Sequence, residues 1–189
     1  MATVNSYTGR MPTPDRTSLD AIIAAARDLL EENGLAGLTM SAVATRVGVR
    51  APSLYKRVPS RDRLLQLVAE ATLLELAQRL DATDDLVEGA RRFRAYGHER
   101  PAAFRMVMAP GAGAPLAGLE LRAAASAPII RAAAALAGEK HALAAARTFT
   151  AWASGFVSME LNGGFGLGGD VDEAWDFGVE RLIAALSAR

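Results

Sequence analysis

The sequence predicts an all-α protein of about nine helices, and three observations carry this prediction. Apolar residues recur three and four positions apart along most of the chain, which is the spacing of one helix face. No stretch alternates apolar and polar residues in the manner of a strand, and no repeat of fixed period occurs. Of the 189 residues, 51% are hydrophobic, which is enough to bury a globular core.

Composition removes several classes of function. The chain has no Cys, which excludes disulfides, thiolate catalysis and Cys-based metal sites and fits a reducing cytoplasm. It has no uncharged apolar run of about 18 residues and no basic-then-apolar leader, so we expect no membrane partner and no signal peptide. The net charge is zero, but residues 1–64 carry +3 and residues 65–189 carry −3. This asymmetry indicates nucleic acid as the partner of the N-terminal third.

The chain begins with a predicted disordered tail, residues 1–15, where polar residues and two prolines show no periodicity. A first helix is then predicted from Thr17 to a stop at Asn33-Gly34. Its apolar face comprises Leu19, Ile22, Ile23, Ala26, Leu29 and Leu30. We expect this helix to pack across the two short helices that follow.

Those two short helices form a helix–turn–helix between Thr39 and Leu64. Thr39 is placed to cap the first of them, and Gly48 supplies the turn because it tolerates positive φ. Leu54 anchors the second, whose first turn accepts Pro52. The stretch from 39 to 63 has six basic residues and one acidic residue, a charge of +5. Basic residues and hydroxyls on the outer faces of such a motif suit a DNA backbone.

Six further helices are predicted downstream, over residues 61–80, 84–99, 101–108, 116–137, 139–162 and 171–186. Ser60 caps the first of these, and no Pro or Gly interrupts it, so we expect a rigid rod. Pro101 ends one helix and starts the next. Pro128 predicts a bend or break in the helix over 116–137. A glycine-rich loop, residues 163–169, precedes the last helix.

The helix–turn–helix resembles that of the TetR family of transcriptional regulators. The residues that carry the resemblance are Thr39, Val43-Ala44, Gly48-Val49, Ser53-Leu54-Tyr55, Pro59-Ser60 and Leu64-Leu65. The resemblance implies a helix–turn–helix DNA-binding domain over 16–62 and a helical effector-binding and dimerisation domain over 63–189. It also implies a homodimer through the last two helices, a pseudo-palindromic operator, and a repressor released by a small molecule.

The C-terminal part resembles a TetR subgroup named for a Trp-His-Gly motif on the eighth helix. Trp152 and Gly155 match that motif, whereas Ser154 stands where the subgroup often has His. A second departure lies in the helix–turn–helix, where Arg57-Val58 replaces a frequent His-Phe pair. Arg57 keeps a hydrogen-bond donor, but Val58 is smaller than Phe, so we expect weaker anchoring of this turn.

Position against the family pattern assigns roles on DNA. Phosphate contacts position a protein on the duplex, and base-edge contacts specify the sequence. The expected phosphate contacts are Thr39, Ser41, Tyr55 and Arg61, and Lys56 is expected to meet a phosphate or a base edge. The candidate base readers are Arg46, Arg50 and Ser53, and Arg57 is a further DNA-binding candidate. The alternatives are plain helix capping for Thr39, a core position for Tyr55, and a solvated face for the arginines.

Aromatic and Met side chains in the fifth, sixth and eighth helices suggest a pocket for a largely apolar small molecule. The predicted lining residues are Phe93, Tyr96, Phe104, Met108, Trp152 and Phe156, with Met106 and Met159 in the same cluster. The alternative for each of them is an ordinary core position, and Trp152, Trp175 and Phe177 are also candidates for the dimer bundle.

Other motifs carry no chemistry that we expect to be functional. The G-x-G-x-x-G match at residues 164–169 lacks the preceding strand that a dinucleotide site needs. His98 and His141 lie in different predicted helices without metal-ligand spacing. We therefore predict no catalytic residues, no metal and no cofactor. The rival hypothesis is an all-α dimeric small-molecule-binding or interaction protein whose helix–turn–helix is only structural, and the charge of +5 argues against it.

Overall fold

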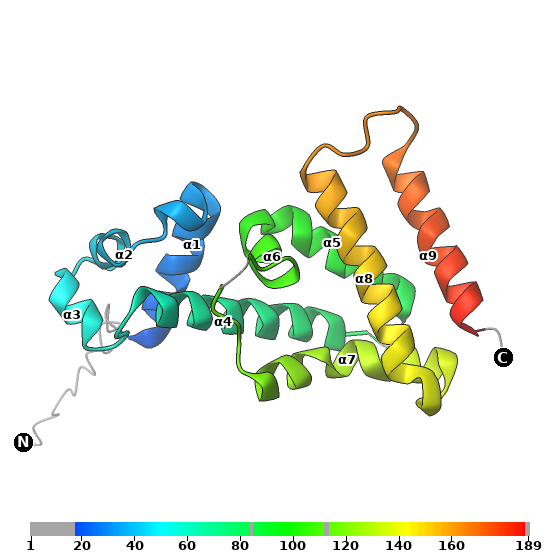
Figure 1. The fold of residues 1–189 in the computed structure, drawn as a ribbon, viewed down its shortest axis with the longest axis horizontal. Coiled ribbons are helices and arrows are strands. Elements are labelled where there is room, and N and C mark those ends of the chain that lie inside the picture. The colour runs from blue at the N-terminus through cyan, green and yellow to red at the C-terminus, as the bar shows by residue number, and fades with distance from the viewer. Residues whose placement is uncertain (1–17, 84, 112–113, 188–189) are drawn as a thin grey trace, which may run out of the picture.

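The computed structural model describes residues 18–83, 85–111 and 114–187, and over these residues it contains helices and no strand. The predicted tail, residues 1–15, lies outside the described residues. The helices are α1 (Leu19–Gly37), α2 (Met40–Val47), α3 (Ala51–Tyr55), α4 (Arg61–Asp81), α5 (Leu86–Glu99), α6 (Pro101–Met108), α7 (Leu119–Ala137), α8 (Ala142–Leu161) and α9 (Val171–Ser187), with a 3-10 turn at Glu139–His141 (Figure 1). The all-α prediction is confirmed.

Local sequence determines where α2 begins and ends and where α4 begins. The Thr39 hydroxyl accepts a hydrogen bond from the Ala42 amide, and the Ser60 hydroxyl accepts one from the Arg63 amide, each 3.1 Å long. Both caps satisfy amides that have no partner inside their own helix. Gly48 ends α2 with φ of 75°, a left-handed conformation that glycine adopts at no steric cost.

Two predicted boundaries differ from the structure. The backbone leaves the helical conformation at Gly34, where φ is 65°, but one more turn carries α1 to Gly37. α7 begins at Leu119 and passes through Pro128 as one helix. Of the predicted bend or break at Pro128, the break is therefore wrong. Alanines on both sides of Pro128 favour helix, and α7 packs against both α4 and α8. These contacts hold the helix together across the hydrogen bond that Pro128 cannot make.

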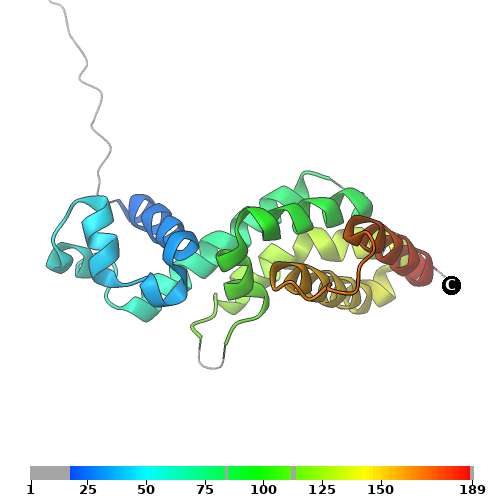
Figure 2. The same cartoon turned by 90° about the horizontal axis from the view of Figure 1, so that it is seen from above.

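The helices enclose two large apolar cores that are joined by α4 and α6, and a small third cluster lies between α7 and α8. The first core lies within α1–α3 and the start of α4, which we call the N-terminal unit, and it includes Ile22, Leu30, Val43, Leu54 and Val58. The second core lies among α4, α5, α6, α8 and α9. Figures 1 and 2 both show the N-terminal unit at one end of the long α4 and α9 at the opposite end.

Helix α6 belongs to both cores although it has only eight residues. Ala103 lies in the core of the N-terminal unit, while the next residue, Phe104, lies in the second core. Arg100, which precedes α6, offers no side-chain cap. The cap comes from α1 instead, because the two carboxylate oxygens of Glu31 accept hydrogen bonds of 2.9 Å from the amides of Ala102 and Ala103. A carboxylate at this place also complements the positive end of the helix dipole.

We expect Glu31→Gln to destabilise the protein by about 0.5–2 kcal/mol, the usual cost of losing a helix cap. A Gln side chain keeps the size of Glu but has only one oxygen to accept the two amides. The measurement is urea unfolding, together with faster amide exchange at Ala102 and Ala103. The matched control is Glu32→Gln, which removes a carboxylate one position away that pairs with the exposed Arg46 and caps no helix. Its loss should cost no more than the small contribution of an exposed ion pair, and should not change amide exchange at Ala102 and Ala103. Equal effects of the two substitutions would contradict the capping role.

A polar cluster ties α1 to the C-terminal helices beside this cap. Arg27 of α1 forms an ion pair with Glu75 of α4, and Arg79 bridges Glu75 at 3.0 Å and Glu99 at 2.7 Å. The Arg79 guanidinium lies 4.9 Å from the centre of the Tyr96 ring. Burial raises the pKa of the Tyr96 hydroxyl. Charged and polar groups therefore add to the apolar contacts of the first core in holding α1 to α4 and α6.

Candidate nucleic-acid interface and ligand cavity

The surface formed by α2 and α3 carries the residues predicted to meet DNA. In α3 only Leu54 is buried, with 1% of its surface exposed, and it points into the core of the N-terminal unit. Its neighbours Ser53, Tyr55 and Lys56 are exposed. Tyr55 has 49% of its surface exposed, so its ring is not a core aromatic. α3 and Lys56, the residue that follows it, therefore present a hydroxyl, a phenol and an ammonium group to solvent.

Basic side chains surround this helix. Arg50, directly before α3, and Lys56 and Arg57, directly after it, are all exposed. Neither Arg50 nor Lys56 makes an ion pair within the described part of the chain. Their charges are available to an external anion, and phosphates of a DNA backbone are such anions.

Two of the predicted DNA contacts are engaged elsewhere in this structure. The Arg46 guanidinium forms a double contact with the Glu32 carboxylate of α1, at 3.1 Å and 2.5 Å. This hydrogen-bonded ion pair raises the pKa of Arg46 and lowers that of Glu32. Arg61 donates from Nε to the Leu38 carbonyl at 2.9 Å and from a terminal nitrogen to the Leu35 carbonyl at 2.6 Å. Arg61 thus fastens the α1–α2 connection to the start of α4.

The N-terminus of α2 keeps its predicted features. Thr39 and Ser41 are exposed, and the Thr39 hydroxyl caps the helix while its proton remains free to be donated. No acidic residue lies in the first turn of α2. The positive end of the helix dipole is therefore open to an anion. Val58, expected to anchor weakly, is fully buried in the core of the N-terminal unit, so the smaller side chain still fills its site.

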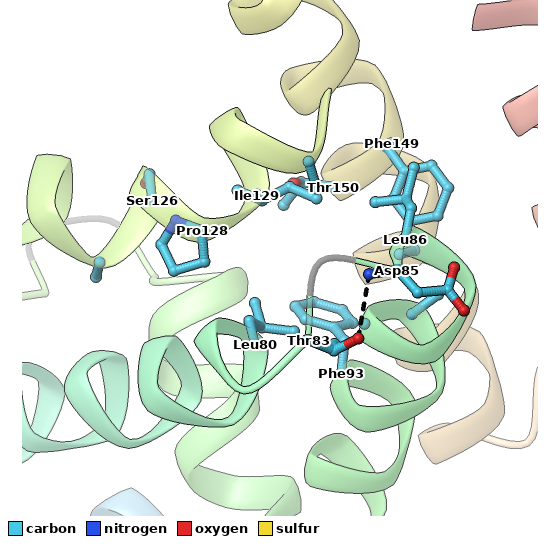
Figure 3. A pocket seen from close by; sticks show the side chains of 15 residues that line it. Leu80, Thr83, Asp85, Leu86, Phe93, Ser126, Pro128, Ile129, Phe149 and Thr150 are labelled. Atoms are coloured by element: carbon cyan, nitrogen blue, oxygen red, sulfur yellow. Dashed lines mark hydrogen bonds between the residues drawn. The ribbon is translucent and has the colours of Figure 1, made fainter. Parts of the chain in front are cut away.

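A partly open cavity lies among α4, α5, α7 and α8, near the end of α4 that is remote from the N-terminal unit. Figure 3 shows it from close by. The space open to the centre of a water-sized sphere is about 100 Å³. The walls comprise Leu80, Thr83, Asp85, Leu86, Gly89, Ala90, Phe93, Ala125, Ser126, Pro128, Ile129, Ala132, Phe149, Thr150 and Ala153. The Asp85 carboxylate caps α5 by accepting from the Val87 amide at 3.0 Å. The rest of the lining is mostly apolar, with hydroxyls from Thr83, Ser126 and Thr150.

The structure places only one of the six predicted ligand-binding residues, Phe93, on the wall of this cavity. Tyr96 and Phe104 have no exposed surface and belong to the second core. Trp152 and Phe156 lie against Trp175 of α9, with ring centres 5.0 Å and 5.2 Å from it. Met108 lines a separate groove beside α7 and α8. The six residues therefore do not converge on one site.

The cavity residues that sequence reasoning did not select are mainly aliphatic or small. Leu80, Leu86, Ile129 and Phe149 carry ordinary helical periodicity and differ in no visible way from core residues. The available signal was the run of alanines in α7, since Ala125 and Ala132 leave space that larger residues would fill. Across the part of the chain that the structure describes, no three His, Asp or Glu side chains come close enough together to hold a metal ion.

Comparison with known proteins identifies the class. The sequence pattern of the bacterial regulatory proteins of the tetR family matches residues 22–68, and that of the tetracyclin repressor-like C-terminal domain matches residues 86–182. An uncharacterised HTH-type transcriptional regulator of Mycobacterium tuberculosis is 31% identical over 187 residues, which cover 93% of this chain and 84% of that protein. The protein belongs to the TetR family and is a DNA-binding transcriptional regulator.

Two solved structures support this assignment. A TetR variant from Acinetobacter baumannii in complex with minocycline is 28% identical, with a TM-score of 0.67, and the match covers 89% of this chain and 95% of that one. BioQ with its double-stranded DNA operator is 25% identical, with a TM-score of 0.62, and the match covers 90% and 98%. None of these matches names the Trp-His-Gly subgroup, which stays a prediction.

Among residues 18–83, 85–111 and 114–187, no helix combines the length and the hydropathy needed to cross a bilayer.

Proposed function

We propose that this regulator is a cytoplasmic, dimeric repressor that reads a pseudo-palindromic operator with α3 and leaves it when a small ligand binds the C-terminal helices. The observation that carries the proposal is the surface of α3, where one side chain is buried and the exposed ones are Ser53, Tyr55 and Lys56 between Arg50 and Arg57. In a dimer two such helices enter successive major grooves about one helical turn apart. BioQ, which was solved on its operator, has the same fold.

The structure narrows the roles we propose on DNA. Arg50 and Ser53 are the better base readers, because Arg46 must first give up Glu32. Tyr55, Lys56, Arg57 and the N-terminus of α2, with Thr39 and Ser41, position the protein on phosphates. Arg61 acts on DNA chiefly by holding the α1–α2 connection in place. We propose a DNA-binding domain over residues 16–62 and an effector and dimerisation domain over 63–189.

We propose the cavity of Figure 3 as the inner part of the effector site. Its apolar walls and few hydroxyls suit a largely apolar molecule. α4 links the two sites, because Arg61 at its start contacts the α1–α2 connection and Leu80 near its end lines the cavity. Ligand and operator then weaken each other by one coupling free energy.

The dimer interface we propose is the outer face of α8 and α9. On α8 this face carries Ala144, Thr148 and Met159, which are exposed, and on α9 it carries Phe177, which has 60% of its surface exposed. Small residues allow a helix of a second copy to approach closely, and Phe177 and Met159 supply apolar area. Burial of exposed apolar surface is the usual driving force for association.

The test uses duplex DNA that the purified protein selects from a random library, with binding measured at increasing salt. We expect Lys56→Ala to weaken binding about equally on all sequences and to lower the salt slope by about one. We expect Arg50→Ala to cost about 1–3 kcal/mol and to relax specificity at one base pair of each half-site. The control is Arg91→Ala, which removes an exposed charge from α5. Absence of salt-dependent, saturable binding by the parent protein would instead favour a helix–turn–helix kept only for packing.

A further inference from the structure

A second, larger hollow crosses the surface beside the cavity. It lies between the end of α6 and the facing sides of α7 and α8, and we call it the α7–α8 groove. The space open to a water-sized sphere is about 780 Å³. Its apolar surface comes from Met108, Leu119, Ile129, Ile130 and Leu143, of which Leu119 has 74% and Leu143 49% of its surface exposed. Exposed aliphatic side chains of this size favour an apolar occupant.

The charges of the groove have one sign. Arg122 of α7 and Arg147 of α8 are the charged residues among those that line it, and no Asp or Glu does so. Both arginines are exposed. Neither has an ion pair or a side-chain hydrogen bond within the described residues, whereas Arg79, Arg94 and other arginines of the C-terminal helices are paired. Residues 65–189 carry a net negative charge. A groove whose charged lining residues are two arginines without ion pairs therefore differs in charge from the rest of the C-terminal domain.

Hydroxyl groups complete the lining. Ser126 of α7 and Thr150, Ser154 and Ser158 of α8 follow the groove. The hydroxyl of Ser126 donates to the Arg122 carbonyl at 2.9 Å and that of Ser158 to the Ser154 carbonyl at 2.7 Å. The oxygens of these two hydroxyls can still accept hydrogen bonds, but their protons are already donated to backbone carbonyls. The Ser154 hydroxyl donates to the Met108 sulfur at 3.6 Å. The guanidinium groups therefore offer the charged donors for an anionic group, beside the Thr150 hydroxyl.

We propose that the α7–α8 groove binds an amphipathic anion, a molecule with one carboxylate and an aliphatic chain, as the effector of the regulator. The chain lies on the aliphatic side chains of the groove, and the carboxylate meets Arg122 or Arg147. A guanidinium binds a carboxylate through two parallel hydrogen bonds, which a neutral or cationic head group cannot reproduce. The proposal rests on the ligand-released repressor described above and specifies the chemistry of its ligand.

The groove is connected to the N-terminal unit through α6. Val107 and Met108, at the end of α6, line it, and the start of the same helix is capped by Glu31 of α1. Ser126, Ile129 and Thr150 line both the groove and the cavity of Figure 3, so the two spaces share a wall. An occupant of the groove therefore touches one end of α6, and the other end of α6 contacts the N-terminal unit.

The binding test is calorimetric titration of the full-length protein with decanoate, 1-decanol and decyltrimethylammonium, which share one chain and differ in charge. We expect decanoate to bind more tightly than the other two by about tenfold or more, because hydrogen bonds to charged groups are the stronger ones. Arg122→Ala/Arg147→Ala should remove this preference and leave decanol binding unchanged, and the single variants show which arginine holds the carboxylate. Arg91→Ala is the matched control and should keep the preference. Equal affinity for the three probes overturns the proposal.

Two further measurements separate the possible failures. If the double variant lowers the dimer fraction in light scattering while the decanoate preference persists, the groove belongs to a second copy and the proposal is overturned. Release of selected DNA is then followed by fluorescence anisotropy. Decanoate binding that depends on the arginines supports the proposed ligand site. If decanoate binds in this way and the DNA is not released, the proposed function as a ligand-released repressor is wrong.

Discussion

Trp175→Ala should lower the free energy of unfolding by about 3–5 kcal/mol, the usual cost of truncating a buried aromatic side chain. Trp175 has 1% of its surface exposed, and its ring centre lies 5.0 Å from that of Trp152 and 5.2 Å from that of Phe156. The Arg94 guanidinium lies 5.3 Å from the same ring. This residue is the main apolar anchor of α9, so its loss should also detach half of the proposed dimer interface.

The measurement is urea unfolding at two protein concentrations, with Phe177→Ala as the control. Phe177 lies two positions along α9 but is exposed, so its truncation should cost little within one subunit. If Phe177 belongs to the dimer interface, Phe177→Ala should make the unfolding midpoint depend more strongly on protein concentration than it does in the parent protein. Trp175→Ala should reduce stability at both concentrations. A small loss for Trp175→Ala would show that α9 is held mainly by other contacts, such as Val179 in the second core and the ion pair between Arg94 and Asp172.

Phe104→Ala should cost about as much, roughly 3–5 kcal/mol. Phe104 is fully buried in α6, and its ring meets that of Phe93 edge-on with centres 5.2 Å apart. Gly97 has no side chain at this place, and an added Cβ would overlap Val157 and crowd the Phe104 ring. The ring therefore fills a close junction of α5, α6 and α8, and its removal leaves a cavity that these helices cannot easily close.

The location of the loss distinguishes Phe104 from its neighbours. Phe104 belongs to the second core, whereas Met106 of the same helix packs against the core of the N-terminal unit. Hydrogen exchange should therefore rise first in α5 and α8 for Phe104→Ala, and first in α1 and α2 for Met106→Ala. Met106 is only partly buried, so its truncation should have the smaller effect. Equal exchange patterns in the two variants would indicate one undivided core.

Sequence reasoning succeeded where the cause was local. Thr39, Gly48 and Ser60 act within a few residues of themselves, so caps and turns could be assigned from the residue types. Periodicity located the helices for the same reason. It could not exclude a break at Pro128, because the contacts that carry α7 through this residue come from other helices and leave no mark on its own sequence.

The candidate sites divide in the same way. Exposure of Ser53, Tyr55 and Lys56 follows from a short helix with one apolar anchor, which the sequence displays. The partners of Arg46 and Arg61 are Glu32 and backbone carbonyls of another segment, and only the folded chain brings them together. The residues of the predicted aromatic pocket are spread over the second core, the cavity wall and a separate groove, because periodicity identifies inward-facing residues without distinguishing a core from a cavity wall.

The cap on α6 has a consequence for how freely the two parts of this protein could be exchanged with those of relatives. A helix of eight residues is too short to persist by itself, and this one has no cap of its own. Its start is completed by Glu31, which lies far earlier in the chain, within the N-terminal unit. A chimaera that joins this C-terminal domain to a foreign head within α4 would leave α6 unfinished unless the new head carries a carboxylate at the position of Glu31. The N-terminal unit and the C-terminal domain match separate family patterns, but they cannot be exchanged independently, because Glu31 of the first caps a helix of the second.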